Sequence, residues 1–106
     1  MTTGAAWHLD NPLKPWANFD AEAIRDIPVE WDLWFADIGS PHASHTVIAA
    51  APLVILGSAE TGGIIKVRVS TDGTGTLGNK YPFTVRVVAV DGEQDDQTLW
   101  LKLILR

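Results

Sequence analysis

The stretch Ile64-Ile65-Lys66-Val67-Arg68-Val69-Ser70 decides the fold class of this chain. In it, branched apolar residues alternate with charged or polar ones, which is the period of a strand with one buried face. The run Phe83-Thr84-Val85-Arg86-Val87 repeats this alternation. We therefore expect the apolar members of both runs to face a core, the charged members to face water, and the protein to be all-β.

Turn-forming residues divide the second half of the chain into strands. Glycine and proline mark the breaks, and Asp91-Gly92 is a dipeptide typical of a tight hairpin. The glycine-rich segments Gly57 to Gly63 and Thr71 to Gly78 are expected to be connections. The strands expected in this half are residues 46–49, 53–56, 64–70, 81–90 and 97–105, the last with Leu99, Leu101, Leu103 and Leu105 on one face.

Residues 29–35 also alternate with a period of two, which predicts a strand. Trp31, Trp34 and Phe35 fit the i, i+3, i+4 spacing of a helix as well, so a short helix stays open. With this segment the chain holds about six evenly spaced strands, which favours a small antiparallel immunoglobulin-like or fibronectin-like β-sandwich. Tyr81, which begins a long strand after a glycine-rich loop, resembles a tyrosine-corner position.

The N-terminal residues 1–18 combine prolines, glycine and asparagine with Trp7 and Trp16. Proline lacks a backbone donor and biases its neighbour away from helix, so we expect an irregular N-terminal arm ahead of a β-sandwich domain at residues 19–106. The two tryptophans need an apolar cover, which is either the chain's own domain or a neighbouring subunit. Residues 20–25 are expected to form one short helical turn with Asp20 as its cap.

The composition narrows the classes of partner. The chain has 106 residues, enough for one domain with a core of its own. A net charge of −5 and a pI near 4.9 disfavour a phosphate-binding surface. The absence of cysteine excludes disulfides and thiolate metal sites. Because no apolar run is long enough for a membrane helix and no secretory signal is visible, we expect neither nucleic acid nor a membrane as a partner.

No group of residues in the sequence indicates an enzyme. The histidines His8, His42 and His45 accompany no serine elbow and no complete ligand set, and the segment around the last two is interpreted as a solvated loop. Gly73-x-Gly75-x-x-Gly78 has the letters of a dinucleotide motif, but no helix follows it, so it is interpreted as a turn. The acidic hairpin tip does not match the EF-hand calcium motif. We expect no catalytic residue, no metal and no cofactor.

Aromatic and acidic residues are the candidate protein contacts. Trp100 and Ile104 lie opposite the leucine row of the final strand, where either the N-terminal arm or another subunit covers them. The acidic hairpin tip is interpreted as solvated, with contact to a basic partner surface as the alternative. The candidate interface residues are Trp7, Trp16, Trp34, Trp100, Ile104, Asp91, Glu93, Asp95 and Asp96.

A series of features begins with Glu30-Trp31-Asp32-Leu33-Trp34-Phe35-Ala36-Asp37. It continues with Ala43-Ser44-His45-Thr46-Val47, with Gly78-Asn79-Lys80-Tyr81 after the glycine-rich loop, and with a hairpin over Val87 to Asp96. In these features residues from about 19 to 106 resemble the fibre–tail adaptors of tailed phages. The resemblance implies a non-enzymatic β-sandwich, made in the bacterial host cytoplasm, that links tail fibres or ring proteins to the tail or neck of the virion.

Two other functions stay open. Small phage β-sandwiches also serve as capsid decoration proteins, which differ from a tail ring in their copy number per particle. A carbohydrate-binding module would need Trp31, Trp34 or Trp100 to be exposed and coplanar. The expected partners are other virion proteins, namely tail, neck or fibre subunits, with the chain itself in a homo-oligomeric ring.

Overall fold

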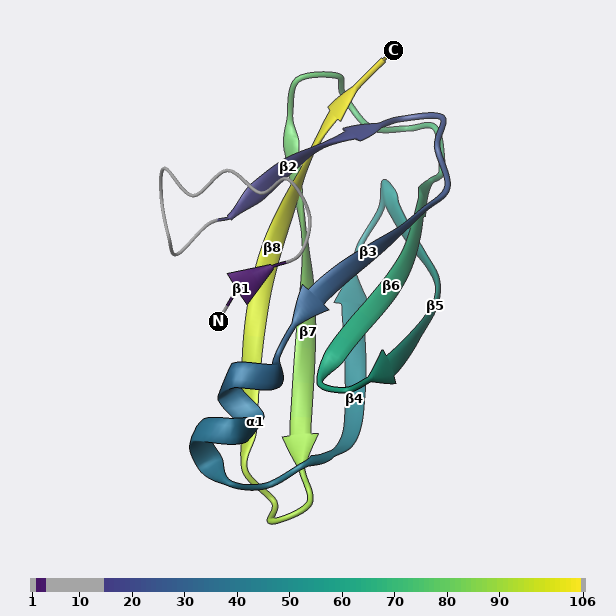
Figure 1. Ribbon diagram of the computed structural model, residues 1–106. Helices are drawn as coiled ribbons and strands as arrows, with labels where there is room; N and C mark the ends of the chain where they lie inside the picture. Colours follow the sequence, from purple (N-terminus) through teal and green to yellow (C-terminus); the bar gives the residue numbers. More distant parts are fainter. Residues whose placement is uncertain (1, 4–14, 106) are drawn as a thin grey trace.

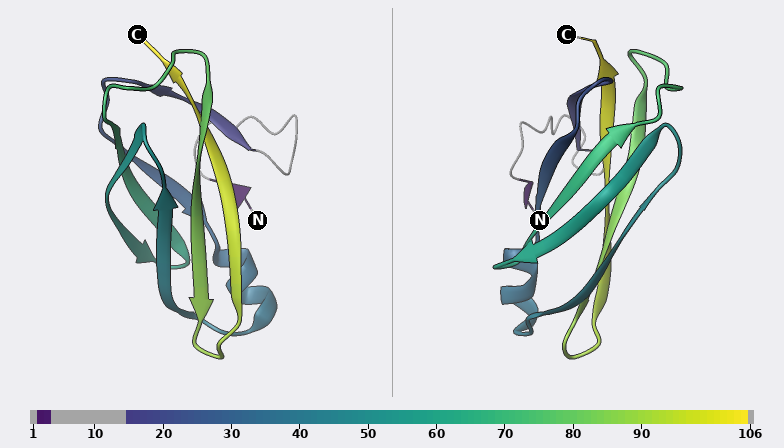
Figure 2. Two further views of the ribbon diagram at one scale, coloured as in Figure 1. Left: turned by 180° about the vertical axis from the view of Figure 1, so that it is seen from behind. Right: turned by 90° about the vertical axis from the view of Figure 1, so that its right-hand side faces the viewer.

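The computed structural model describes residues 2–3 and 15–105 of the chain. Two four-stranded sheets pack face to face as a sandwich (Figure 1; Figure 2, right). The first sheet has the order β1 (Thr2–Thr3), β3 (Arg25–Glu30), β6 (Ile64–Thr71) and β5 (Leu53–Thr61). The second has the order β2 (Trp16–Asp20), β8 (Gln94–Ile104), β7 (Lys80–Ala89) and β4 (His42–Ala49). Neighbouring strands are antiparallel except for β2 and β8, which run parallel. The all-β sandwich is confirmed, while its immunoglobulin-like character stays a prediction.

The core lies between the two sheets and is built by the alternation seen in the sequence. In β6 the inward residues are fully buried and the charged residues between them are exposed, as predicted. The same alternation holds along β7, where Phe83, Val85 and Val87 are buried. The leucine row of β8 is buried through Leu103, but Leu105 is exposed because the strand ends at Ile104. Burial of one face of each strand is the main favourable contribution to folding.

The sandwich begins earlier in the chain than the sequence predicted. The expectation of an irregular arm is wrong for residues 16–18, which belong to β2. Residues 20–25 are not a helical turn: Asp20 ends β2, residues 21–24 form the connection, and Arg25 begins β3. Phe19 is fully buried and pairs in register with Leu103 of β8. A short segment of low strand propensity thus forms a strand because it pairs with β8, as often happens in sheets.

Residues 29–35 are divided between two elements. The prediction of a continuous strand is wrong: β3 ends at Glu30, and α1 spans Asp32–Ile38. The alternative of a short helix agrees with the structure, because Trp31 and Phe35, four positions apart, are both buried on one side. The helix ends at Gly39, whose positive φ of 68° is a common way of terminating a helix.

The edge strands β4 and β5 are longer than predicted. Residues 57–61 continue β5 as a strand past an irregularity between Ile55 and Gly57, so the prediction of a connection from Gly57 is wrong there. The connection to β6 is only Gly62 and Gly63, both with positive φ, which is the backbone that a two-residue hairpin turn requires. The strand β4 likewise begins at His42, four residues before the predicted start.

The connections gather at the two ends of the sandwich. Helix α1 and the β7–β8 hairpin lie at one end, and the β2–β3 turn and the loop of residues 72–79 lie at the other (Figures 1 and 2). That loop, which contains the Gly73-x-Gly75-x-x-Gly78 motif, leads directly into β7, so its interpretation as a turn is confirmed. Each end therefore presents its own set of side chains.

Candidate interaction surfaces

The predicted interface residues fall into two groups in the described part of the chain, while Trp7 lies outside the described residues. One group lies on the outer face of the second sheet and is called here the tryptophan face; it comprises Trp16, Trp100 and Ile104 with Lys80 and Lys102. The other lies where α1 meets the β7–β8 hairpin and is called the acidic end; it comprises Trp34, Asp37, Asp91, Glu93, Asp95 and Asp96.

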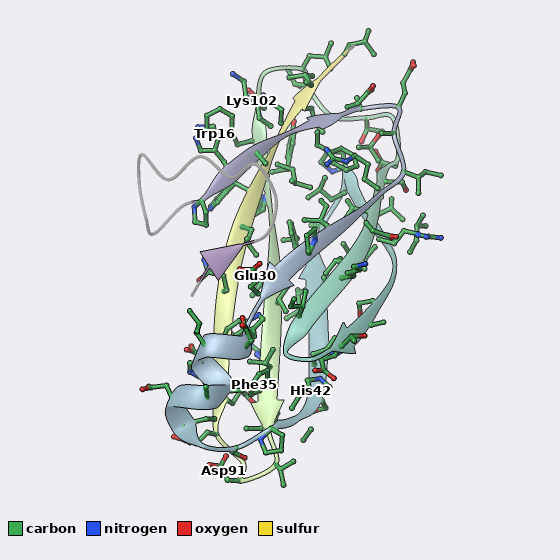
Figure 3. All side chains as sticks on the ribbon, in the orientation of Figure 1. Trp16, Glu30, Phe35, His42, Asp91 and Lys102 are labelled. Atoms are coloured by element: carbon green, nitrogen blue, oxygen red, sulfur yellow. The ribbon has the colours of Figure 1, made fainter. Side chains whose placement is uncertain are left out.

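The tryptophan face is organised around Trp16. Its side chain is partly buried, with the Lys80 ammonium nitrogen 4.2 Å and the Lys102 nitrogen 5.5 Å from the ring centroid. Figure 3 labels Trp16 and Lys102, which lie near one another on this face. Both distances are within the range of cation–π attraction. Trp16 therefore contacts its own domain, which is one of the two surfaces expected from the sequence to cover this side chain.

The strand partners explain why these residues share a face. Trp16 lies opposite Trp100 in the parallel β2–β8 pair, and the Trp100 backbone N–H donates to the carbonyl of Pro15 at 2.9 Å. Trp100 and Ile104 are each partly buried, whereas the alternate leucines of β8 point into the core. The tryptophan face is thus a set of half-exposed apolar and basic groups over two neighbouring strands.

The hairpin of the acidic end has a fixed backbone. The Asp91 carboxylate accepts the Glu93 backbone N–H at 3.0 Å, and the Ala89 backbone N–H donates to the Glu93 carbonyl at 2.8 Å. Gly92 has a φ of 93°, which a side chain would strain. The hydroxyl of buried Ser40, just after α1, accepts the Asp91 backbone N–H at 3.1 Å. The hairpin tip is therefore tied to the segment that follows the helix.

Charges at the acidic end are only partly balanced. Arg86 donates to both carboxylate oxygens of Asp96 at 2.8 and 3.0 Å, and this hydrogen bonding holds the pKa of Asp96 below its usual value. The pKa of Glu93 is raised, chiefly by the hydrogen bond and the negative charge of Asp91, and also by the charge of Asp37. At the acidic end Asp96 is thus paired with Arg86, while Asp91 and Glu93 interact with one another.

A third cluster joins the open edges of the two sheets and is called here the histidine bridge. His42 Nε2 lies 2.9 Å from His45 Nδ1, and His45 Nε2 lies 2.9 Å from the Ser58 hydroxyl. His42 Nδ1 is 3.6 Å from a carboxylate oxygen of Glu60. Burial and the charge of His42 lower the pKa of His45. The prediction of a solvated loop here is wrong, because both histidines lie on β4 and contact β5.

Sequence reasoning missed Ser58 and Glu60 as members of this bridge. The two residues lie in a segment that the glycine count assigned to a connection, and only the pairing of β5 with β6 extends the strand through them. Glu60 also accepts the Gly63 backbone N–H at 2.7 Å, which anchors it at the hairpin. A run of polar residues on a long edge strand was the signal available in the sequence.

The same side chains form neither a metal site nor a flat aromatic platform in the described part of the chain. Within residues 2–3 and 15–105, no three histidine or acidic groups converge in a way that could hold a metal ion. Trp31 is buried, and its ring stands at 82° to that of Trp34, so these two do not form the coplanar platform that a sugar-binding face needs. In the described part of the chain, no helix has the length and apolar character to cross a membrane.

Tyr81 ties the glycine-rich loop to the start of β7. The Thr76 backbone N–H donates to the Tyr81 hydroxyl oxygen at 2.9 Å, and this bond is the main reason that the pKa of Tyr81 is lowered. A phenol at the start of a long strand, bonded to the backbone a few residues upstream, has features in common with the tyrosine corner. The loop is thereby held against the sandwich.

Comparison with known proteins places the chain in a family. No curated protein matches it. The family model described as podophage GP4 fiber-tail adaptor protein gp77 matches residues 20–102, which run from the last residue of β2 to near the end of β8. The match therefore covers strands β3 to β7, most of β8, the helix α1 and the acidic end. This chain belongs to the family of podophage fiber-tail adaptor proteins.

Proposed function

We propose that this protein is a non-enzymatic adaptor subunit that links tail fibres or ring proteins to the tail or neck of the virion by protein–protein packing. The observation that carries the proposal is the family match over residues 20–102. It spans three strands of each sheet, from β3 into β8, and the helix between β3 and β4. The sandwich would act as a rigid body that presents different side chains at its faces and ends.

Exposed apolar side chains support a packing role. Leu33 on α1 is 61% exposed, and Leu56 on the edge strand β5 is 51% exposed. Val54 on β5 and Ile48 on β4 are exposed as well, on strands that each have one hydrogen-bonded neighbour within residues 2–3 and 15–105. Open edges with apolar side chains favour pairing with another protein surface. The homo-oligomeric ring is proposed on this ground.

The N-terminal arm is proposed to contribute to docking, with a boundary adjusted to the structure. Because Pro15 is buried and β2 begins at Trp16, the body of the protein begins at Pro15. Thr2 pairs with Glu30 in the first sheet, so one part of the N-terminal segment adds to the chain's own body. Removal of residues 1–14 leaves β2 whole and also removes the two-residue edge strand β1, so this truncation tests the arm and β1 together.

Reconstitution of the tail tests the adaptor role. Particles produced by a phage from which this gene is deleted are expected to lack fibres and to regain them when the purified full-length chain is added, as seen by negative-stain microscopy. Particles that assemble a complete fibred tail without the chain would contradict the proposal. The chain bound around the capsid in many copies, rather than at the tail in a few, would support a decoration protein instead.

Solution mass tests the ring and the arm. Light scattering of the full-length chain is expected to show an oligomer, and the chain without residues 1–14 is expected to be a folded species of lower mass. A full-length chain that is monomeric alone and also monomeric on the purified tail would contradict the ring. An oligomer unchanged by the truncation would contradict the docking role of the arm and leave the edge strands as the contact.

A further inference from the structure

A hollow of about 370 Å³ lies between α1 and the first residues of β8, at the acidic end. From the helix it is lined by Leu33, Trp34 and Asp37, and from the strand by Asp95 and its two successors. The labelled Asp91 marks this end of the molecule in Figure 3. Leu33 and Trp34 give the hollow an aliphatic and aromatic wall, and the carboxylates of Asp37, Asp95 and Asp96 are called here its acidic wall.

The acidic wall offers unneutralised charge. Asp96 is engaged with Arg86, but among the described residues neither Asp37 nor Asp95 forms an ion pair with a basic side chain. Asp95 uses one carboxylate oxygen to accept the Asp96 backbone N–H at 2.8 Å, which fixes its side chain beside the hollow. Asp91 and Glu93 on the hairpin add further carboxylates at this end. A cation entering the hollow would be attracted.

The aromatic wall is held in place by its neighbours. The ring of Trp34 stands edge-on to Trp31, with centroids 5.5 Å apart, and to Phe35, with centroids 5.2 Å apart. Trp34 is nevertheless only partly buried, and Leu33 beside it is 61% exposed. A preset aromatic ring beside carboxylates is the arrangement that binds cations through the ring quadrupole.

A buried donor at the hollow lacks an acceptor. Trp31 is 2% exposed and lines the hollow, and its indole N–H has no hydrogen-bond partner among the residues that the structure describes. A buried donor without a partner costs free energy, so such groups are uncommon. An occupant of the hollow that carries a carbonyl oxygen, as a peptide does, is a candidate acceptor for this group.

We propose that this hollow is a binding site for an arginine side chain of a partner protein. The inference rests on the proposed function only in taking the partner to be another tail protein. Arginine fits both walls, because its planar guanidinium stacks on an aromatic ring and donates to two carboxylates at once. Lysine offers a compact, strongly hydrated charge without that stacking. The peptide carbonyls next to the bound arginine would lie near the Trp31 indole.

Titration with small peptides tests the site without a known partner. The full-length ¹⁵N-labelled chain is titrated with acetyl-Gly-Arg-Gly-amide, with the lysine peptide of the same form, and with its citrulline peptide, a neutral isostere of arginine. The arginine peptide is expected to shift the indole N–H signals of Trp31 and Trp34 and to bind several-fold more tightly than the lysine peptide. The citrulline peptide is expected to cause no comparable shift.

Matched variants assign the effect to the two carboxylates. D37N and D95N remove charge with little change of shape, and together they are expected to weaken arginine-peptide binding by about tenfold. The control E22Q makes the same charge change in the exposed β2–β3 turn at the other end and should leave binding unchanged. Equal binding of arginine and lysine peptides, an effect of E22Q as large as that of the double variant, or no response of the two indoles would each overturn the proposal.

Tail binding separates this site from the adaptor role. If the wild-type chain restores fibres and the D37N/D95N double variant restores them equally well, the arginine site is wrong while the adaptor function stands. If the wild-type chain fails to bind tails, the adaptor function is wrong, and the peptide titration still decides the site. A fall in solution mass for the double variant would identify a second copy as the occupant and overturn the partner assignment.

Discussion

His42 Nε2 and His45 Nδ1, both on β4, lie 2.9 Å apart, and each ring also contacts the opposite sheet. His45 reaches Ser58 and His42 reaches Glu60, so β4 is connected to β5 at the open edge of the sandwich, where His42 is labelled in Figure 3. One of the two ring nitrogens must be unprotonated for the bond to exist, because an imidazolium has donors only. The bridge therefore depends on the charge of the two rings.

The histidine bridge is expected to make stability depend on pH. The pKa of His45 is lowered below 6.5, first by burial and then by the charge of His42, with Glu60 acting in the opposite direction. A base whose folded pKa is depressed binds fewer protons folded than unfolded, so stability is present above the unfolded pKa and falls as the pH drops through it. Urea unfolding should show this loss between about pH 7 and pH 5.

The variant E60Q identifies the source of that dependence. It removes the negative charge that raises the pKa of His45, while its amide oxygen can still accept the Gly63 N–H. The pKa of His45, followed by its ring signals in NMR, should therefore fall further in E60Q and stay unchanged in E22Q. A rise in E60Q would show that Glu60 does not act on His45 in this way.

Gly63 is expected to tolerate a side chain less well than Gly73, although both have a φ of 85°. An added Cβ at Gly63 would lie 2.7 Å from the Asp32 Cα, whereas at Gly73 nothing lies within 4 Å. Both G63A and G73A carry the left-handed backbone cost of about 1–2 kcal/mol. G63A should lose about 1–3 kcal/mol more through overlap with the start of α1. Equal losses in urea unfolding would contradict this difference.

Phe19 is expected to be a main anchor of β2. Its side chain is fully buried against β8, so F19A should lower the free energy of unfolding by about 3–5 kcal/mol. The neighbouring residue Asn18 is exposed, and N18A should stay within about 0.5 kcal/mol of the wild type. A small loss for F19A would mean that β2 is dispensable and that the body of the protein begins at β3.

Asp91 is expected to control the ionisation of Glu93. Its hydrogen bond and charge are the main causes of the raised pKa of Glu93, so D91N should lower that pKa towards its ordinary value. The asparagine oxygen can still accept the Glu93 backbone N–H, which keeps the hairpin in place. Carboxyl signals followed by NMR from pH 3 to pH 7 give the measurement (ordinary pKa about 4.3). An unchanged pKa would assign the effect to Asp37 instead.

Strand alternation allowed much of the sandwich to be predicted. In β6 and β7 the period of two is long enough to name the buried face residue by residue, and the Asp91-Gly92 turn fixes the β7–β8 hairpin. The segment 29–35 shows the limit of this reasoning, because its aromatic residues fit two periods equally. In the structure the strand ends at Glu30, the last residue of β3 that pairs with β6, and the helix follows. The Trp31 backbone N–H, one residue later, donates to the carbonyl of Gly63 in the turn before β6.

The sequence indicated candidate residues, but it did not show which of them lie together in the structure. Acidic residues near the turn at Asp91 were visible in the sequence, but their meeting with Trp34 depends on where α1 packs. In the histidine bridge, His45 and Ser58 are 13 positions apart and belong to different sheets. Neither meeting leaves a local pattern, because each depends on how the two sheets are laid against one another.

The sequence by itself determined the strand faces of β6, β7 and β8, the hairpin turn and the family, since these follow from local alternation, turn chemistry and ordered motifs. The packing of the sheets makes residues 16–20 a strand, starts a helix at Asp32, and brings acidic and aromatic side chains together at one hollow. The physical reason is that strand pairing and burial of apolar surface between sheets outweigh weak local propensities, and both depend on residues far apart in the chain.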